Sequence, residues 1–183
     1  MKYLIFSDLH GSFQAIQKIQ SIIEQNEFDL IISLGDILYH GPRNDLPEDY
    51  CPKKVIEFLK RYQNKMLYIK GNCDAEVDEM VLESKFYKMK KIKFATKTIY
   101  LTHGHHLSRF APNKNLEKDS IVLYGHYHVF DISKIDDVIY INIGSTSIPK
   151  DGIPQYAIID EHGIFIYSLE DYHLIGKYSF EGD

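Results

Sequence analysis

Seven side chains that could bind metal ions follow short apolar runs of this sequence. They are two carboxylates, one amide and four imidazoles, namely Asp8, His10, Asp36, Asn72, His103, His126 and His128. Asp8 and His10 stand two positions apart just past an apolar run, so both side chains can point to the same side of the chain. His126 and His128 repeat that spacing later in the sequence. The recurrence predicts that these residues meet at a single site.

This ligand set suits divalent first-row metals such as Mn, Fe or Zn, and it is poor for soft Cu(I). None of the seven candidates is a cysteine, so the site requires no thiolate ligand. Seven ligands are too many for one ordinary ion, whereas two ions that share a bridging carboxylate would use them all. Two metal ions about 3.5–4 Å apart are a known solution for displacement at phosphorus. The indicated chemistry is therefore the hydrolysis of a phosphate ester.

Each candidate ligand also has a plainer interpretation. Asp8 and His10 could be a capping carboxylate and a surface histidine at a strand end. Asp36 and Asn72 both follow glycine and could be turn residues, since both types favour turns. The later histidine pair could be a pH-sensitive surface feature. Taken together and in order, however, the seven residues favour metal binding.

The apolar runs before these residues are short and rich in Ile, Val and Tyr, which indicates strands buried on both faces. Apolar residues recur at three- and four-residue steps from Phe13 to Ile23 and predict a helix with Ser12 as its N-cap. A second helix is predicted from Pro52, since proline is tolerated in a first turn. From Val138 onward, strands joined by tight turns predict antiparallel hairpins.

This order of elements predicts an α/β fold: βαβ units first, then an antiparallel meander, together forming a layered sandwich of mixed sheets. Ligands of α/β sheets collect at the carboxyl ends of the strands, where six apolar runs here deliver polar residues. A chain of 183 residues fits one domain, residues 1–183. The basic run Lys85–Lys93 alternates with apolar residues and predicts a half-exposed strand. A homo-oligomer formed through the Lys85–Lys97 region stays open.

Composition limits the partners of the protein. The formal net charge of -5 gives no general attraction to nucleic acid or anionic membranes, so stable nucleic-acid binding is not expected. No apolar run is long enough to cross a bilayer, and the N-terminus does not resemble a signal peptide. Two cysteines, Cys51 and Cys73, are too few for a disulfide framework. We therefore expect a cytoplasmic protein without a membrane partner.

The motifs in their order resemble those of the calcineurin-like metallophosphoesterase superfamily. The matching blocks are Asp8-x-His10, Gly35-Asp36, Gly71-Asn72, His103-Gly104 and Gly125-His126-x-His128. Single blocks carry little weight, but the ordered set is specific and covers most of the chain up to about Lys150. Finer blocks are similar to the small bacterial YfcE-type phosphodiesterases: His40–Asn44, Gly71–Asp74 and Ser145–Lys150. The resemblance implies a four-layer αββα sandwich, the metallo-dependent phosphatase fold.

The resemblance also implies a role for each candidate ligand at a binuclear centre. A first metal ion would be held by Asp8, His10 and His128, a second by Asn72, His103 and His126, with Asp36 as the bridge. The metals are divalent, with Mn²⁺ expected first and Fe, Zn, Ni or Mg as alternatives. A hydroxide between the two ions would attack phosphorus. The implied catalytic residues are Asp36, Asn72, Cys73 and His103.

Cys73 departs from the pattern of the wider superfamily, in which histidine follows the Gly-Asn pair and stabilises the transition state or protonates the leaving group. The YfcE-type subgroup shares the cysteine. A thiol with a reference pKa of about 8.5 is neutral at pH 7 and donates hydrogen bonds weakly. Loss of an acid slows poor leaving groups most. We therefore expect alkyl esters to react slowly and aryl-like esters to be tolerated.

Four further residues are candidates for substrate binding. Arg43 and Asn44 lie in a Gly-Pro loop, where the arginine fork could bind a phosphate or simply be solvated. His40 could line the same site or only precede a turn. His105 stands beside the candidate ligand His103 and could contact substrate or support the ligand.

The sequence predicts a metal-dependent phosphodiesterase that acts on a small phosphodiester. A phosphomonoesterase is the alternative among enzymes. A protein-interaction scaffold is the alternative outside enzymes, since some members of the superfamily, notably the small subunit of retromer, are thought to have taken that role with an eroded metal site. All seven ligand positions are filled here, which favours catalysis.

Overall fold

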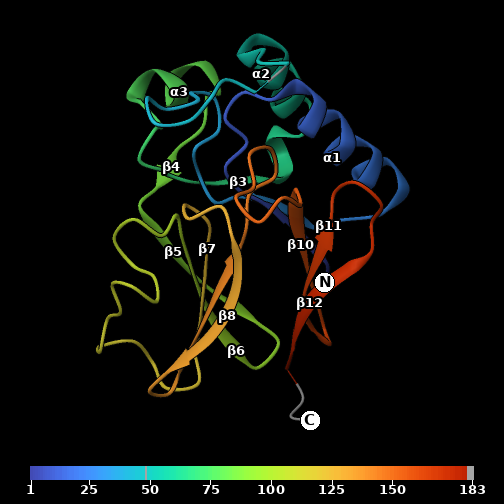
Figure 1. Cartoon of the computed structure of the whole chain (residues 1–183). Coiled ribbons are helices and arrows are strands. Elements are labelled where there is room, and N and C mark those ends of the chain that lie inside the picture. Colours follow the sequence, from blue (N-terminus) through green and yellow to red (C-terminus); the bar gives the residue numbers. More distant parts are fainter. Residues whose placement is uncertain (48, 181–183) are drawn as a thin grey trace.

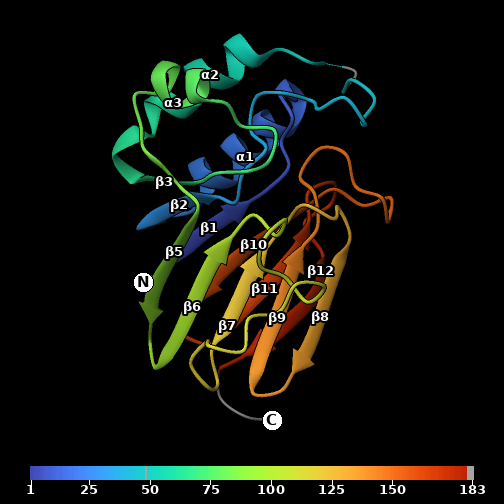
Figure 2. The same cartoon turned by 90° about the vertical axis from the view of Figure 1, so that its left-hand side faces the viewer.

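The strands form two sheets that pack face to face (Figures 1 and 2). The computed structural model describes residues 1–47 and 49–180. The seven-stranded sheet has the spatial order β12 (Leu174–Ser179), β11 (Gly163–Ser168), β10 (Gln155–Asp160), β1 (Tyr3–Phe6), β2 (Leu30–Ser33), β3 (Met66–Ile69) and β4 (Phe86–Tyr87). The five-stranded sheet has the order β5 (Met89–Phe94), β6 (Lys97–Thr102), β7 (Ile121–Tyr124), β9 (Val138–Ile143) and β8 (Phe130–Ile135).

Both sheets are mixed. In the first sheet β1 to β4 run parallel, and β10 joins β1 in the antiparallel sense and continues through β11 and β12 as a meander. In the second sheet β6, β7 and β9 run parallel, and β5 and β8 flank them in the antiparallel sense. The expected α/β fold with mixed sheets and a C-terminal antiparallel meander is confirmed.

Three α-helices and one 3₁₀ turn lie over the outer face of the seven-stranded sheet (Figure 1): α1 (Phe13–Gln25), α2 (Pro52–Arg61), η1 (Gln63–Lys65) and α3 (Glu76–Val81). The two helices expected from the sequence are confirmed. The Ser12 hydroxyl accepts a hydrogen bond from the Ala15 N–H at 3.2 Å and caps α1, and Pro52 occupies the first turn of α2. None of the helices in these residue ranges is both long and apolar enough to cross a membrane.

Strand β1 shows why the apolar runs become central strands. Leu4 and Phe6 face the helices, whereas Ile5 faces the second sheet and packs in one core with Leu101 and Leu123. All three β1 residues are fully buried. A strand covered on both faces needs apolar residues at every position, as the sequence pattern predicted.

The outer face of the five-stranded sheet is covered by a loop. Tyr100, Val122 and Tyr124 form an apolar cluster on this face together with Leu107 of the segment between β6 and β7. Within the described ranges no helix lies over them. The layers are therefore helix, sheet, sheet and loop, so the fourth layer of the expected αββα sandwich is not helical. This segment contains Pro112 and a polar stretch without the 3.6-residue periodicity of a helix.

Candidate metal centre

The seven candidate ligands lie on loops that leave the carboxyl ends of five strands. These ends belong to β1, β2 and β3 in one sheet and to β6 and β7 in the other. Figure 2 shows the parallel strands of the second sheet ending at one edge, below the loops of the first. The loops are hydrogen-bonded to each other: the Asp8 N–H donates to the Gly35 carbonyl at 3.0 Å, and the Gly125 N–H donates to the His103 carbonyl at 2.9 Å. The site is thus assembled from both sheets.

The backbone at the site is held in an unusual conformation. Ten non-glycine residues in the described ranges have positive φ, and five of them are candidate ligands: Asp8 (54°), His10 (47°), Asp36 (55°), His126 (70°) and His128 (60°). A non-glycine residue in this left-handed region is strained, and such strain persists only where the surroundings enforce it. Its concentration on predicted ligands is independent support for a functional site.

One cluster of ligand atoms is formed by Asp8, His10 and His128. Asp8 Oδ1 lies 3.2 Å from His128 Nε2 and 3.8 Å from His10 Nε2. The Nδ1 atoms of the two histidines lie 2.8 Å and 2.9 Å from the carbonyl oxygens of Tyr39 and Ile148, respectively. A carbonyl oxygen only accepts, so each Nδ1 carries the hydrogen, and in a neutral ring Nε2 keeps its lone pair for the site.

Two atoms of this cluster test whether it suits a metal ion. Asp8 Oδ1 and His10 Nε2 are buried and have no hydrogen-bond partner. An unpaired buried polar atom is costly, and a bound cation would satisfy both atoms at once. The three side chains place ligand atoms within 4.8 Å of one another. Carboxylate and imidazole donors at these distances fit a divalent first-row metal.

The other four candidates continue from this cluster. Asp36 Oδ2 lies 3.8 Å from His10 Nε2 and 3.3 Å from His103 Nε2. His103 Nε2 lies in turn 3.1 Å from the Asn72 amide oxygen and 3.3 Å from His126 Nδ1. His103 Nδ1 donates to the Leu34 carbonyl at 2.8 Å, which again directs Nε2 inward. All seven predicted residues therefore meet in one continuous cluster.

Comparison with known proteins shows which family the chain belongs to. Residues 1–163 match the calcineurin-like phosphoesterase superfamily domain. The chain belongs to this superfamily. It is 35% identical over 181 residues to the phosphodiesterase YfcE of Escherichia coli K12, a match that covers 97% of each protein. It is 25% identical over 167 residues to the phosphodiesterase MJ0936 of Methanocaldococcus jannaschii, which covers 87% of this chain and 93% of that one.

Comparison with solved structures supports the same relationship. The structure of the E. coli phosphoesterase YfcE matches with a TM-score of 0.93 and 33% identity, over 99% of this chain and 100% of the other. Vps29 of Entamoeba histolytica complexed with Zn²⁺ matches with a TM-score of 0.63 at 17% identity, a likeness that concerns the fold alone. The resemblance found in the motifs is confirmed for the superfamily and for its YfcE-like members.

The charges of the cluster suit a site for cations. Burial raises the pKa of Asp8, but the nearby His128, whose Nε2 lies 3.2 Å from Asp8 Oδ1, and the charge of His103 outweigh burial and hold that pKa well below its usual range. Burial lowers the pKa of His103, but the hydrogen bond to Asp36 and the charges of both carboxylates raise it to about 9. Burial and the charge of His103 lower the pKa of His126 to about 4. The cluster thus keeps ionised carboxylates at neutral pH, which attract divalent cations.

Asp74 joins two loops of the candidate site. Its carboxylate is 7% exposed and accepts hydrogen bonds from the backbone N–H groups of Asp36 (2.9 Å), Ile37 (2.8 Å) and Gly71 (2.7 Å). The loop after β2 is therefore fastened to the loop after β3. Sequence reasoning did not single Asp74 out, although an acidic residue two positions after Asn72 is the signal that could have found it.

Cys73 contributes both its backbone and its thiol. Its N–H donates to Asp36 Oδ1 at 2.8 Å, which leaves Oδ2 of that carboxylate for the cluster. The thiol lies within 4.8 Å of ligand atoms of His10 and Asp36. It is therefore close to the candidate metal centre, although the sequence did not assign it as a ligand. Burial and the negative charge of Asp36 raise the pKa of the thiol to about 12. The side chain is therefore a poor proton donor at neutral pH.

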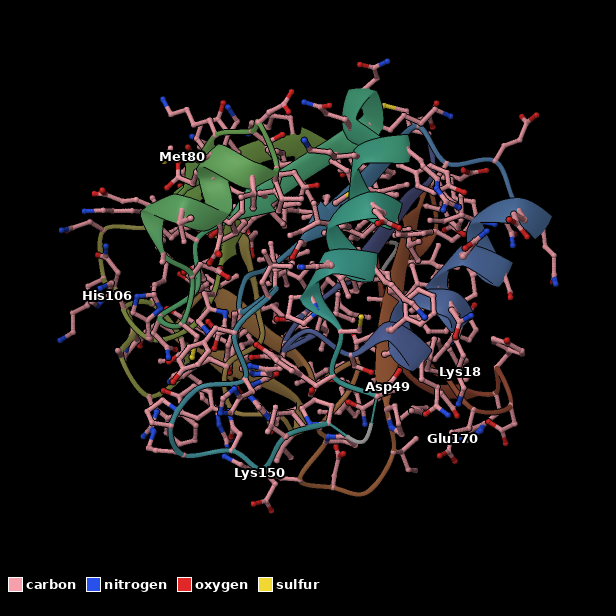
Figure 3. The ribbon with its side chains drawn as sticks, turned by 90° about the horizontal axis from the view of Figure 1, so that it is seen from above. Lys18, Asp49, Met80, His106, Lys150 and Glu170 are labelled. Carbon is pink, nitrogen blue, oxygen red and sulfur yellow. The ribbon has the colours of Figure 1, made fainter. Side chains whose placement is uncertain are left out.

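A cleft of about 260 Å³ opens over the cluster. Arg43 and Asn44, both predicted as substrate contacts, line it beside Asp36 and Cys73. Tyr127 and Lys150 line it as well, and sequence reasoning assigned neither of them a role. Figure 3 shows Lys150 at the edge of the molecule. Lys150 was visible in the sequence only as the last residue of a motif block, and Tyr127 only as the residue between two ligand histidines.

The other two predicted substrate contacts lie elsewhere. His40 is half-buried between Tyr39 and Tyr50, with ring centroids at 4.7 Å and 5.5 Å, and it is absent from the cleft lining. His105 lies behind His103, with ring centroids 5.4 Å apart, and it lines a separate hollow. The neighbouring His106 is exposed, at the left edge of Figure 3.

Proposed function

We propose that this protein is a metal-dependent phosphodiesterase with a binuclear centre of divalent cations. The observation that carries the proposal is the buried cluster itself, in which Asp8 Oδ1 and His10 Nε2 face each other without a hydrogen-bond partner. Full-length similarity to two proteins named phosphodiesterases supports the same reaction class.

The distances support an assignment of ligands to two ions. One ion would be held by Asp8, His10 and His128, the other by Asn72, His103 and His126. Asp36 would bridge, because its Oδ2 lies within 3.8 Å of histidine nitrogens from both groups. Mn²⁺ suits this oxygen and nitrogen set, and Fe, Zn, Ni and Mg are alternatives whose choice depends on availability.

Bound cations would supply an activated water and neutralise charge on the phosphate oxygens. The chain itself supplies the orientation. The carbonyls of Tyr39, Leu34 and Ile148 fix three ligand histidines, so no imidazole has to rotate when substrate arrives. Arg43 and Lys150 line the cleft as cations and would bind phosphate oxygens, with Asn44 beside them.

A diester is favoured over a monoester by the two relatives, both of which are named phosphodiesterases. Cys73 is a poor acid, so departure of a good leaving group, such as a phenol, is favoured over departure of an alcohol. The small cleft suits a small substrate rather than a polymer.

The scaffold alternative draws on the similarity in fold to Vps29. Strain at five candidate ligands argues against it, because a partner-binding surface gains nothing from strained, buried ligand atoms. We infer further that residues 1–183 act as one domain, since the strands of both sheets share one apolar core. A cytoplasmic location, the absence of a nucleic-acid partner and self-association through the Lys85–Lys97 region remain predictions.

The proposed reaction is tested with metal-stripped protein given bis(p-nitrophenyl) phosphate or p-nitrophenyl phosphate, with Mn²⁺, Mg²⁺, Zn²⁺ or Ni²⁺ restored in turn. We expect Mn²⁺ to restore diester cleavage above monoester cleavage. Asp36→Asn should lower it by more than about 100-fold, because loss of groups that merely support ligands already lowers activity by about 10–100-fold. Asp29→Asn, at an exposed carboxylate before β2, is the matched control and should behave as wild type.

Two results would change the proposal. Dominant monoester cleavage would favour the phosphomonoesterase. Failure of every metal to restore turnover, in protein that still binds the ions, would contradict catalysis on these substrates and favour the scaffold.

A further inference from the structure

An apolar side chain that packs on a residue of the cleft lining is itself open to solvent. Phe110, in the segment between β6 and β7, is 61% exposed. Burial of apolar surface is what makes an aromatic side chain stabilising, so the exposed ring adds little to the stability of the fold. Its ring packs on Tyr127, with centroids 4.8 Å apart and planes at 58°. We call these two residues the aromatic wall.

Tyr127 connects the aromatic wall to the metal centre. It stands between the candidate ligands His126 and His128 and lines the cleft with them. Its ring meets that of His126 edge to face, with centroids 4.9 Å apart, and its hydroxyl lies 3.3 Å from Ser108 Oγ. Contacts on both ends of the side chain thus fix the ring at the cleft.

The loop that carries Phe110 is anchored. The Arg109 guanidinium lies 3.2 Å from Asp131 of β8 and 4.5 Å from the centroid of the Phe110 ring. Ser108 and Ala111 exchange backbone hydrogen bonds across the turn. A cation over an aromatic face and a closed turn hold the exposed ring in place before any ligand arrives. A prearranged apolar surface needs little ordering when it binds.

The cleft therefore combines two kinds of recognition. Arg43 and Lys150 offer positive charge for phosphate, and Tyr127 offers an aromatic surface that Phe110 continues. On the basis of the proposed function, we propose that the aromatic wall stacks against a planar aromatic ester group of the substrate phosphodiester. This selects aryl or nucleoside esters over aliphatic ones, because flat rings gain from contact with aromatic side chains whereas small alkyl groups do not.

Binding of unreactive phosphonates isolates the contact with the ring. Mn²⁺-loaded protein is titrated calorimetrically with phenylphosphonate and methylphosphonate, which share the phosphonate and differ in the ring. We expect phenylphosphonate to bind about 5- to 10-fold more tightly, the range of a good aromatic contact. Phe110→Ser should lower the ratio of the two affinities, with Tyr127 alone left to contact the ring, and leave methylphosphonate binding unchanged. Tyr127→Phe, which keeps the ring, should retain the ratio.

Titration with thymidine 5′-monophosphate tests whether the aromatic wall binds nucleobases or simple aryl groups. A larger loss of affinity in Phe110→Ser for this nucleotide than for phenylphosphonate assigns the wall to nucleobases, and the reverse assigns it to aryl groups. Equal affinities for the two phosphonates in wild type, or an unchanged ratio in Phe110→Ser, would overturn the proposal. Because binding requires no turnover, a ring-dependent ratio in protein that cleaves no diester would refute only the proposed function.

Discussion

Three of the four candidate ligand histidines are each oriented by one backbone carbonyl. His10, His103 and His128 each direct Nδ1 to a main-chain oxygen at 2.8–2.9 Å and turn Nε2 toward the carboxylates. His126 differs, since its Nδ1 faces His103 at 3.3 Å. His103 Nε2 lies 3.3 Å from Asp36 Oδ2 and 3.1 Å from the Asn72 amide oxygen. A cation bound between these groups would therefore compete directly with a proton on His103.

Cation binding at His103 should release a proton. The pKa of His103 is about 9, so below pH 9 the ring is protonated and must lose its proton before Nε2 can bind a metal. Mn²⁺ affinity should rise about tenfold per pH unit between pH 6 and 8 and level off above pH 9. Calorimetry in buffers of different ionisation enthalpy should detect the proton released at pH 7.

His105→Gln is the matched control for this measurement. Burial and the charge of His103 lower the pKa of His105 to about 4, so this ring is already neutral and its loss should not change proton release. His103→Gln should reduce it; part should remain, because burial lowers the pKa of His128 but the nearby Asp8 outweighs burial and raises it. Mn²⁺ affinity that does not vary with pH in wild type would contradict the protonated state of His103.

Residue types and spacing were enough to predict that the seven candidate ligands lie together, because the pairs Asp8-x-His10 and His126-x-His128 can be recognised from the sequence alone. The roles of Tyr127 and Asp74 could not be predicted in this way. Tyr127 acquires a position in the cleft only when β7 lies beside β6 and the connecting loop places Phe110 against it. The role of Asp74 depends on hydrogen bonds from three backbone N–H groups, two of which lie in the loop after β2 and not in its own loop after β3.

At the level of elements, the strand ends position the site and the loops hold it together. The loops after β2 and β3 meet at Gly35 and Gly71, where an added Cβ on Gly35 would lie 2.6 Å from the Gly71 nitrogen. This approach is too close for any side chain, and it lets Asp74 reach backbone donors of both loops. Both glycines are needed for contact between the loops rather than for turns alone.

Asp74→Asn should loosen this contact. An amide can replace only one of the two carboxylate oxygens as acceptor, and a hydrogen bond to a charged group is worth about 1.5–3 kcal/mol. We expect the free energy of unfolding to fall by about 2 kcal/mol and Mn²⁺ affinity to fall by about 10-fold or more. Denaturant unfolding and metal titration measure the two effects.

Asp78→Asn controls for loss of stability alone. Asp78 is equally buried at 7% and accepts the Ala75 N–H at 2.8 Å in the first turn of α3, away from the ligands. Its replacement should lower stability while Mn²⁺ affinity stays as in wild type. If Asp74→Asn binds Mn²⁺ as tightly as Asp78→Asn does, Asp74 has no part in positioning the centre.

Apolar runs and capping signals predicted the central strands and the first two helices, because burial on both faces leaves a pattern in the sequence. The segment from Lys85 to Lys93 was harder. The predicted half-exposed strand is divided at Lys88, so that β4 pairs with β3 in one sheet and β5 pairs with β6 in the other. The alternation of polar and apolar residues is the same before and after Lys88, so this pattern cannot show where the chain passes from one sheet to the other.

At the level of the whole molecule, the centre joins the two sheets. Asp8, Asp36 and Asn72 come from the seven-stranded sheet, and His103 and His126 come from the five-stranded sheet. Cations held by ligands of both sheets would add a second connection to the apolar core between them. Metal binding should therefore stabilise the molecule as a unit.

Removal of metal should lower the melting temperature. Mn²⁺ at about 100 times its Kd stabilises the folded state by about 2.7 kcal/mol per site. For a chain of this size that corresponds to a rise in Tm of about 5–10 °C per occupied site. Differential scanning calorimetry with and without chelator measures it, and Asp8→Asn should show a much smaller shift. Equal shifts in wild type and variant would place the stabilising metal elsewhere.

The central claim is that two cations at this cluster carry phosphodiester hydrolysis, and stepwise loading tests it most directly. Metal-stripped protein is titrated with Mn²⁺ while bound ions are counted and bis(p-nitrophenyl) phosphate cleavage is followed at each step. We predict saturation at two ions per chain, with activity that appears as the second ion binds. Full activity at one ion, or in the stripped protein, would contradict the account.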